Sequence, residues 1–277
     1  MKKIPLYQVD VFAERLFAGN PAAVCPLDAW LDDATLQGIA LENNLAETAY
    51  FVKSAKPDVD FDLRWFTPTV EMDLCGHATL ATGYVLLNDL GHRADRIRFA
   101  TRSGILVVER RGNSLWLDLP ASMPAPLASV PSDVVAGIGR EPQSWFTTRV
   151  NFVALFERES DILALTPDFG RLRKFTGRGV ICTAPADRDA APGSLATRQL
   201  DFVSRYFAPG LGVDEDPATG SAHAVLTPFW AGKLGKTRLH ALQRSPRGAV
   251  FDCELIGDRA WMSGPVVPYL RGEITLP

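Results

Sequence analysis

The chain has 277 residues, of which 47% are hydrophobic and 22% are charged, and its formal net charge is −3. This balance is typical of a globular protein, and the interspersed charges exclude the basic stripe that nucleic acid or an anionic membrane would require. There is no secretory leader, no run of 18 apolar residues and no CxxC pair among the four cysteines. We therefore expect a cytoplasmic protein without a membrane span, a disulfide framework or a zinc site.

The first part of the chain predicts mostly short strands, because apolar and polar residues alternate in several runs. Asp32 or Asp33 can cap a short amphipathic helix that contains Leu36 and Ile39. The expected strands are Leu6–Phe12, Thr48–Val52, Phe61–Phe66, Arg96–Thr101, Ile105–Glu109 and Leu115–Leu119, with a hairpin turn at Arg111-Gly112-Asn113.

Four prolines between Pro120 and Pro131 interrupt a stretch without any periodic pattern, which predicts a linker between lobes. We accordingly expect an N-terminal lobe at 1–120 and a C-terminal lobe at 121–277. In the second lobe a helix is expected at Thr166–Phe175. The strands expected there are Arg149–Phe156, Val180–Thr183, Leu200–Phe207, Arg238–Leu242 and Val250–Ile256.

The chain also contains an internal repeat. The segment DFDLRWFTP (Asp60–Pro68) returns 141 positions later as DFVSRYFAP (Asp201–Pro209). A period of about half the chain indicates two similar lobes rather than a solenoid, whose repeats are much shorter. Many short strands with one buried helix in each half predict an α+β lobe that is formed twice.

Each copy of the repeat runs into a helix that is apolar on all sides, at Ala78–Leu87 and Ala222–Ala231. Such helices belong in the core of a domain. Pro228 lies inside the second helix, and we expect it to kink or shorten that helix because proline removes a backbone hydrogen bond.

The turns before these helices are the candidate functional segments. Gly76 and Gly220, with Ser221, lie where free backbone N–H groups and the helix dipole favour an anion. Two such turns facing each other across a cleft would bind a carboxylate and stabilise developing negative charge. The alternative is that glycine and serine only begin the helices.

Four further side chains are candidates. Glu47 interrupts an apolar stretch, so it is either an exposed carboxylate at a strand start or an inward-facing acid/base. His77 and His223 lie near the two turns, as structural residues or in proton transfer, and no histidine–carboxylate spacing indicates a metal. Cys75 can act as a nucleophile or base beside a helix N-terminus, and motif alignment pairs it with Pro217.

Four ordered motifs resemble the PhzF-like isomerase family of phenazine biosynthesis, within the diaminopimelate-epimerase superfamily. They are FAGNPAAV (Phe17–Val24), NNLAETAYFV (Asn43–Val52), CGHATLATGYVL (Cys75–Leu86) and DEDPATGSAHAVL (Asp214–Leu226). The resemblance implies two pseudo-symmetric lobes, each a curved antiparallel sheet wrapped around a central helix. It also implies a homodimer that needs no metal or organic cofactor.

The resemblance implies that Glu47, His77 and Asp216 are catalytic, and that Gly76, Gly220 and Ser221 bind the substrate. The expected activity is a proton shift on a small carboxylate-bearing metabolite, like that of the family member that isomerises trans-2,3-dihydro-3-hydroxyanthranilate. A single shuttling carboxylate serves a shift along one face of a ring, whereas an epimerase needs a base on each face. The alternatives are an epimerase or racemase that uses Cys75, and a catalytically idle protein that binds a metabolite or a partner.

Overall fold

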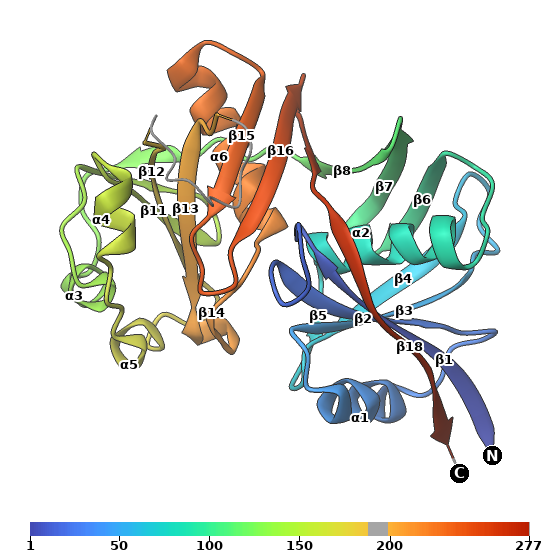
Figure 1. Ribbon diagram of the computed structural model, residues 1–277. Helices are drawn as coiled ribbons and strands as arrows, with labels where there is room; N and C mark the ends of the chain where they lie inside the picture. Colours follow the sequence, from blue (N-terminus) through green and yellow to red (C-terminus); the bar gives the residue numbers. More distant parts are fainter. Residues whose placement is uncertain (188–198, 277) are drawn as a thin grey trace. The chain divides into compact units, whose positions relative to one another are not determined.

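The structure, a computed structural model, describes residues 1–187 and 199–276 and has an α+β fold that divides into two compact units (Figure 1). Unit 1 comprises Met1–Leu119 and Trp261–Pro277, and unit 2 comprises Pro120–Ala260. The division expected from the sequence assigned 121–277 to a single lobe. The C-terminal segment instead belongs to unit 1, because its last strand pairs antiparallel with the first strand of the chain.

Unit 1 contains two α-helices, of which the second continues as a short π-helix. The helices are α1 (Asp33–Asn43), α2 (Gly76–Tyr84) and η1 (Val85–Asp89). The strands are β1 (Lys2–Val11), β2 (Asn20–Pro26), β3 (Glu47–Lys53), β4 (Phe61–Phe66), β5 (Glu71–Met72), β6 (Arg96–Thr101), β7 (Gly104–Arg111), β8 (Ser114–Pro120) and β18 (Val266–Leu276). Strand β17 (Arg259–Ser263) spans the boundary between the two units.

The sheet of unit 1 is mixed. Strand β1 pairs antiparallel with β2 and β18, and β3 pairs antiparallel with β4. The pairs β2–β3 and β4–β6 are parallel. The expectation of a purely antiparallel sheet was therefore wrong, and the connections give the reason. Parallel neighbours need a crossover, which α1 supplies between β2 and β3 and α2 supplies between β4 and β6.

Unit 2 repeats this plan with small additions. Its helices are α3 (Ser132–Ile138), α4 (Glu159–Leu163), α5 (Phe169–Leu172), the 3-10 turn η2 (Pro209–Leu211) and α6 (Gly220–Leu234). Its strands are β9 (Ala125–Leu127), β10 (Ser144–Thr147), β11 (Asn151–Leu155), β12 (Gly179–Pro185), β13 (Phe202–Ala208), β14 (Val213–Glu215), β15 (Arg238–Gln243) and β16 (Ala249–Ile256). Here too β11–β12 and β13–β15 are parallel and β12–β13 is antiparallel.

The strand registers give a residue-by-residue correspondence between the units. Phe66 of β4 and Phe207 of β13 occupy the same position of the repeated segment. Phe66 is opposite Thr48 in β3, and Phe207 is opposite Val180 in β12. One position earlier, Glu47 therefore corresponds to Gly179. This correspondence identifies what unit 2 carries at each candidate position of unit 1.

The helices that follow the repeated segments are buried, as the sequence predicts. Every residue of α2 from Gly76 to Gly83 is buried, and the helix contacts β1, β2, β3 and β7 (Figure 1). Helix α6 contacts β15 and β16 and is buried from Ala222 to Ala231.

Three local expectations differ from the structure. Pro228 does not shorten helix α6, which continues to Leu234. The backbone N–H that Pro228 lacks would have bonded the carbonyl of Ala224, and the Ser122 N–H donates to that carbonyl instead, at 3.0 Å. The proline-rich stretch is not a free linker either, because β9 lies within it and pairs with β10 inside unit 2. The expected helix at Thr166–Phe175 is limited to α5.

Candidate active site

The site in unit 1 begins with the turn between β1 and β2. Gly19 has a φ of +62°, and a Cβ atom at this position would overlap the carbonyl oxygen of Val11. Only glycine fits this close approach of two backbone segments. The turn places the next residue, Asn20, at the start of β2 with a fully buried side chain.

Asn20, Glu47, Cys75 and His77 converge from three elements of unit 1. Glu47 begins β3, Cys75 is the N-cap of α2 and His77 lies in the first turn of that helix. The Nε2 atom of His77 is 3.2 Å from Oε2 of Glu47, and its Nδ1 atom is 3.3 Å from Nδ2 of Asn20 and 3.6 Å from Sγ of Cys75. The structure therefore brings together two of the predicted catalytic residues, Glu47 and His77.

The surroundings of His77 determine its charge. Burial lowers the pKa of His77 to about 3, against a smaller opposing effect of the Pro21 carbonyl, so the ring is neutral near pH 7. The Nδ1 atom faces the Asn20 amide and the Cys75 thiol, and which ring nitrogen carries the proton depends on the tautomer. The Nε2 atom lies 3.2 Å from Oε2 of Glu47 without the geometry of a hydrogen bond. Catalytic contacts of this kind often align only when a substrate is bound.

The same three side chains offer metal-ligand atoms, since an oxygen of Glu47, Sγ of Cys75 and a nitrogen of His77 lie within 4.8 Å of one another. Glu47, however, approaches Nε2 of the ring and Cys75 approaches Nδ1. A single ion binds one ring nitrogen, so it would require the ring or one partner to move. The arrangement fits a hydrogen-bonded group better than a preformed ligand set.

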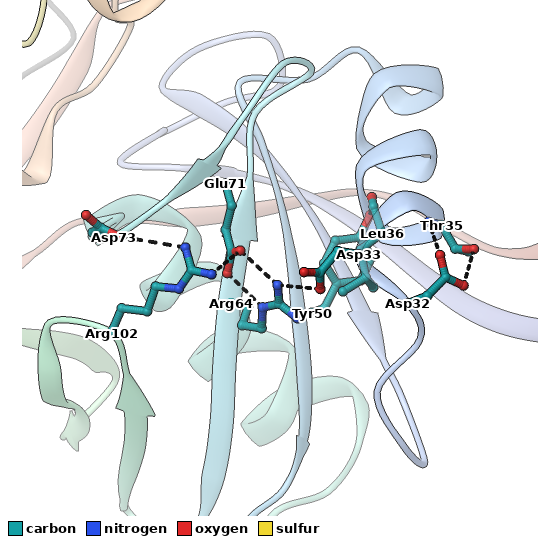
Figure 2. A network of polar contacts seen from close by, with 9 residues as sticks. All are labelled: Asp32, Asp33, Thr35, Leu36, Tyr50, Arg64, Glu71, Asp73 and Arg102. Atoms are coloured by element: carbon teal, nitrogen blue, oxygen red, sulfur yellow. Dashed lines mark hydrogen bonds and ion pairs between the residues drawn. The ribbon is translucent and has the colours of Figure 1, made fainter.

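An ionic network holds the segment that leads to Cys75 (Figure 2). Arg64 of β4 makes a bidentate pair with Glu71, at 2.7 and 2.8 Å, and also contacts Asp33 at 2.8 Å. Glu71 accepts a second guanidinium, that of Arg102, at 2.6 Å. Arg102 in turn approaches Asp73, at 3.8 Å. The Glu71 carboxylate thus links the repeated strand to the residues immediately before the α2 turn.

In unit 2 the turn before α6 is held by side-chain hydrogen bonds around Asp216. The hydroxyl of Thr219 donates to Oδ2 of Asp216 at 2.6 Å, and the Thr219 N–H donates to Oε1 of Gln243 at 2.8 Å. Ser245 donates to the carbonyl of Pro217 at 2.7 Å. Asp216 is partly buried and lies in unit 2.

The helix N-termini have the predicted form. Gly76 and Gly220 are the first residues of α2 and α6, and neither N-cap residue, Cys75 or Thr219, makes a side-chain capping bond to its helix. By contrast, Asp32 caps α1. Ser221 is half-buried in the first turn of α6. Gly76 belongs to unit 1, whereas Gly220 and Ser221 belong to unit 2, and the expectation that the two turns face one another stays a prediction.

His223 is a core residue of unit 2. Its side chain has no exposed surface, its ring stacks on Phe251 with centroids 3.6 Å apart, and Nδ1 contacts the carbonyl of Thr219 at 2.9 Å. Burial lowers its pKa to about 4. These contacts support the structural interpretation of this histidine over one in proton transfer.

The residues at which α2 and α6 begin change the position of unit 2 that corresponds to Cys75. Aligning Gly76 with Gly220 pairs the two N-cap residues, so the counterpart of Cys75 is Thr219 rather than Pro217, and the counterpart of His77 is Ser221. The leader repeat has a spacing of 141, whereas the helix starts are 144 residues apart, which explains the shift. Unit 2 carries no thiol at this position under either alignment.

Sequence reasoning gave no role to Asn20 or Gln243. Asn20 lies inside the FAGNPAAV motif, where Gly19 signals a close turn before it. Gln243 lies outside all four motifs, and only the parallel pairing of β15 with β13 brings it to the turn of Asp216.

Among the helices that the structure describes, none is long and apolar enough to cross a membrane.

Comparison with known proteins agrees with this architecture. Residues 9–258 match the family described as phenazine biosynthesis-like protein. The chain is 48% identical to an uncharacterized isomerase of Pseudomonas aeruginosa over 274 residues, covering 99% of this chain and 100% of the relative. It superposes with a TM-score of 0.89 on a PhzF family protein of Enterococcus faecalis that is 39% identical, covering 99% and 100% of the two chains.

A more distant structure shows how far the fold extends. A hydroxyproline epimerase from Agrobacterium vitis matches with a TM-score of 0.60 at 14% identity, covering 99% of this chain and 91% of that one, so the likeness concerns the fold alone. The resemblance inferred from the four motifs is confirmed. The chain belongs to the phenazine biosynthesis-like (PhzC–PhzF) family.

Proposed function

We propose that the protein is an isomerase that moves a proton on a small carboxylate-bearing metabolite, with Glu47 as the single acid/base. The observation that carries the proposal is the contact of Glu47 with a neutral, buried His77, at 3.2 Å. The position that corresponds to Glu47 in unit 2 is Gly179, so the second unit carries no equivalent carboxylate at that position. Names of relatives support the reaction class, since one is called an isomerase.

In this reaction the Glu47 carboxylate removes a proton from a C–H bond of the substrate. The electron pair of that bond enters the conjugated system, and the protonated Glu47 returns the proton to a carbon further along the same face. The atoms and charges balance without an oxidant or a second base. A neutral His77 that donates from Nε2 would hold the carboxylate in place and stabilise its charged form before the first step and after the second.

The remaining predicted residues serve substrate binding in this proposal. The backbone amides at Gly76, Gly220 and Ser221 would bind the anionic group, because an uncapped helix N-terminus favours negative charge. Asp216 would act with the catalytic residues by positioning a polar group of the substrate for the proton transfer. We further propose a cytoplasmic homodimer that needs neither a metal nor an organic cofactor. Stoichiometric metal that survives chelation and is required for turnover would contradict the last point.

A second candidate is an epimerase or racemase that uses Cys75. The contact that favours it is Sγ of Cys75 to Nδ1 of His77, at 3.6 Å, which would let the ring accept the thiol proton. Its weakness is the missing second base, since the counterpart of Cys75 is Thr219. The two candidates therefore differ in which residue moves the proton and in the stereochemistry of the product.

Proton exchange in deuterated water tests the proposal. The protein is incubated with trans-2,3-dihydro-3-hydroxyanthranilate and with related cyclic dienyl carboxylates, and the position of deuterium is read by NMR. We expect an isomer with the C–H proton moved along one face and no inverted centre. Deuterium at an inverted centre would support the epimerase, and a chain that binds these carboxylates without forming any isomer would overturn the isomerase.

A further inference from the structure

Gln243 lies behind the turn that carries Asp216. It is the last residue of β15, and its side chain has no exposed surface. Its Nε2 atom donates to the backbone carbonyl of Asp216 at 2.6 Å and to the hydroxyl of Thr219 at 3.1 Å. Its Oε1 atom accepts from the N–H of Thr219 at 2.8 Å. A single amide thus holds both ends of the turn between Asp216 and Thr219.

These bonds have only one consistent direction. The Thr219 N–H can only donate and the Asp216 carbonyl can only accept, which fixes the orientation of the Gln243 amide. The hydroxyl of Thr219 accepts from this amide, so its own proton is directed to Oδ2 of Asp216, at 2.6 Å. The result is a chain of hydrogen bonds from Gln243 through Thr219 to the Asp216 carboxylate.

This chain of hydrogen bonds, here called the relay, also changes the role of Thr219, the N-cap residue of α6. An N-cap threonine usually accepts from an N–H in the first helical turn. Thr219 makes no such capping bond, because its hydroxyl is directed to Asp216. The amide of Thr219 itself is taken by Gln243. The first-turn amides of α6 are therefore left without the cap that Asp32 supplies to α1.

Unit 1 has no equivalent of this amide. The last residue of β6, the strand that corresponds to β15, is Thr101, and its hydroxyl donates to the carbonyl of Gly104 within its own turn. Both units do share a serine one turn further on. Ser103 donates to the carbonyl of Asp73 and Ser245 donates to that of Pro217, at 2.8 and 2.7 Å. The serine contact is common to both units, whereas the amide is specific to the turn that carries Asp216.

We infer that Gln243 is a positioning residue for the reaction: through Thr219 it fixes the Asp216 carboxylate and keeps the first turn of α6 open for the anionic group of the substrate. The inference depends on the proposed role of Asp216 in substrate binding and turnover. A displacement of a reacting group by about 1 Å can cost about 10²-fold in rate, so a loosened turn would act on kcat rather than only on stability.

Two variants test the relay. Gln243→Met keeps the size of the side chain and removes all three hydrogen bonds, and Thr219→Val removes the hydroxyl while keeping its shape. We expect kcat to fall by about 10- to 100-fold in each, with a smaller change in KM. Thr219→Ser restores the hydroxyl and should return kcat close to the wild-type value. If the hydroxyl of Thr219 had a purely structural role, kcat of Thr219→Ser would recover only as far as the melting temperature does.

A matched control and a second measurement separate this inference from the proposed function. Gln37 of α1 also donates its amide to a backbone carbonyl, that of Thr67, at 2.8 Å in unit 1. Gln37→Met should lower the melting temperature and leave kcat unchanged. Hydrogen exchange by mass spectrometry on peptides covering 214–222 needs no substrate, and there Gln243→Met should expose the Thr219 amide while Gln37→Met should not.

The kinetic and the hydrogen-exchange measurements would each contradict the inference through a different result. Wild-type exchange protection of the Thr219 amide in Gln243→Met would overturn the positioning role whatever the substrate is. A kcat loss in Gln243→Met that only matches its loss of folded protein, with no rescue by Thr219→Ser, would overturn it as well. If the amide is exposed as expected but Glu47→Gln is fully active, the relay stands and the proposed reaction is wrong.

Discussion

The two units use the same framework but carry different chemistry. In each, the arginine of the repeated strand makes a bidentate pair with a glutamate that precedes the helix turn. Arg64 pairs with Glu71 at 2.7 and 2.8 Å, and Arg205 pairs with Glu215 at 2.8 and 2.9 Å. These half-buried pairs are charge-assisted and geometrically specific, so they fix the turns in both units. The repeat in the sequence therefore records a structural requirement.

The candidate catalytic positions show no such repetition. Glu47, Cys75 and His77 of unit 1 correspond to Gly179, Thr219 and Ser221 of unit 2. At Gly179 the space for a side chain is taken by the hydroxyl of Tyr206, which contacts Asn151 at 3.2 Å. The duplicated fold thus carries a carboxylate at this position in one unit only, and a second helix turn of a different kind. The proposed single-base reaction is compatible with this asymmetry, whereas a two-base reaction would need an equivalent base in the second unit.

The strongest test of the asymmetry is Glu47→Gln, which keeps the shape of the side chain and removes the base. We expect turnover to fall by about 10²- to 10⁴-fold. Folding should survive, because removing a charge from a half-buried position relieves its desolvation. Glu42→Gln, on the exposed face of α1, is the matched control and should keep full activity. An active Glu47→Gln enzyme would refute the assignment.

The next prediction concerns the corresponding position in unit 2. Gly179→Ala should destabilise the protein by about 1–3 kcal/mol, because the new methyl group would overlap the ring and hydroxyl of Tyr206. Gly38→Ala in α1 is the control, since a Cβ there meets nothing within 4 Å. That change should be neutral or stabilise by up to about 1 kcal/mol. Urea unfolding measures both, and equal stabilities would show that unit 2 can accept a side chain where unit 1 has Glu47.

Because His77 and His223 are both buried, we expect both to destabilise the folded protein at acidic pH. Burial lowers the pKa of His77 to about 3 and that of His223 to about 4, from an ordinary value of 6.5. Below pH 6.5 the unfolded chain gains protons that the folded chain cannot take up, so the free energy of unfolding falls as the pH drops. In this range each histidine lowers the free energy of unfolding by at most about 1.4 kcal/mol for each pH unit of acidification. Well above pH 6.5 it adds nothing to the pH slope.

Urea unfolding at pH 7, 6 and 5 checks the acid response. A His223→Phe variant should show a shallower pH slope than the wild type even if its absolute stability is lower, because the slope reports the proton and not the packing. The same slope in both proteins would show that His223 takes up its proton as readily in the folded chain as in the unfolded one.

The smallest effect is expected at Cys75. In a single-carboxylate reaction its thiol only packs beside His77, so Cys75→Ser should keep most of the activity. A thiol-based epimerase predicts the reverse, with Cys75→Ser nearly inactive and Glu47→Gln active. Measuring both variants on one substrate, with melting temperatures alongside, decides between the single-carboxylate reaction and the thiol-based epimerase.

The sequence alone predicted the local elements well wherever a short-range pattern controls them. The alternating runs identified β4 and β6 with their exact limits, and Asp32 was correctly expected as a possible cap of α1. The repeat predicted two buried helices, which α2 and α6 confirm. These features depend on side-chain periodicity and capping chemistry, both of which operate over a few residues.

Only the tertiary structure decided what depends on pairing between distant strands. The assignment of β18 to unit 1 follows from its ladder with β1, and the parallel pairs follow from the crossovers through α1 and α2, neither of which leaves a local signal. The same is true of the site. The motifs identified Glu47 and His77, but their contact, the contact of Asn20 with His77 and the bonds of Gln243 to the Asp216 turn arise where separate strands and helices meet. Residue type sets which chemistry is available, whereas the distances that make it usable depend on long-range packing.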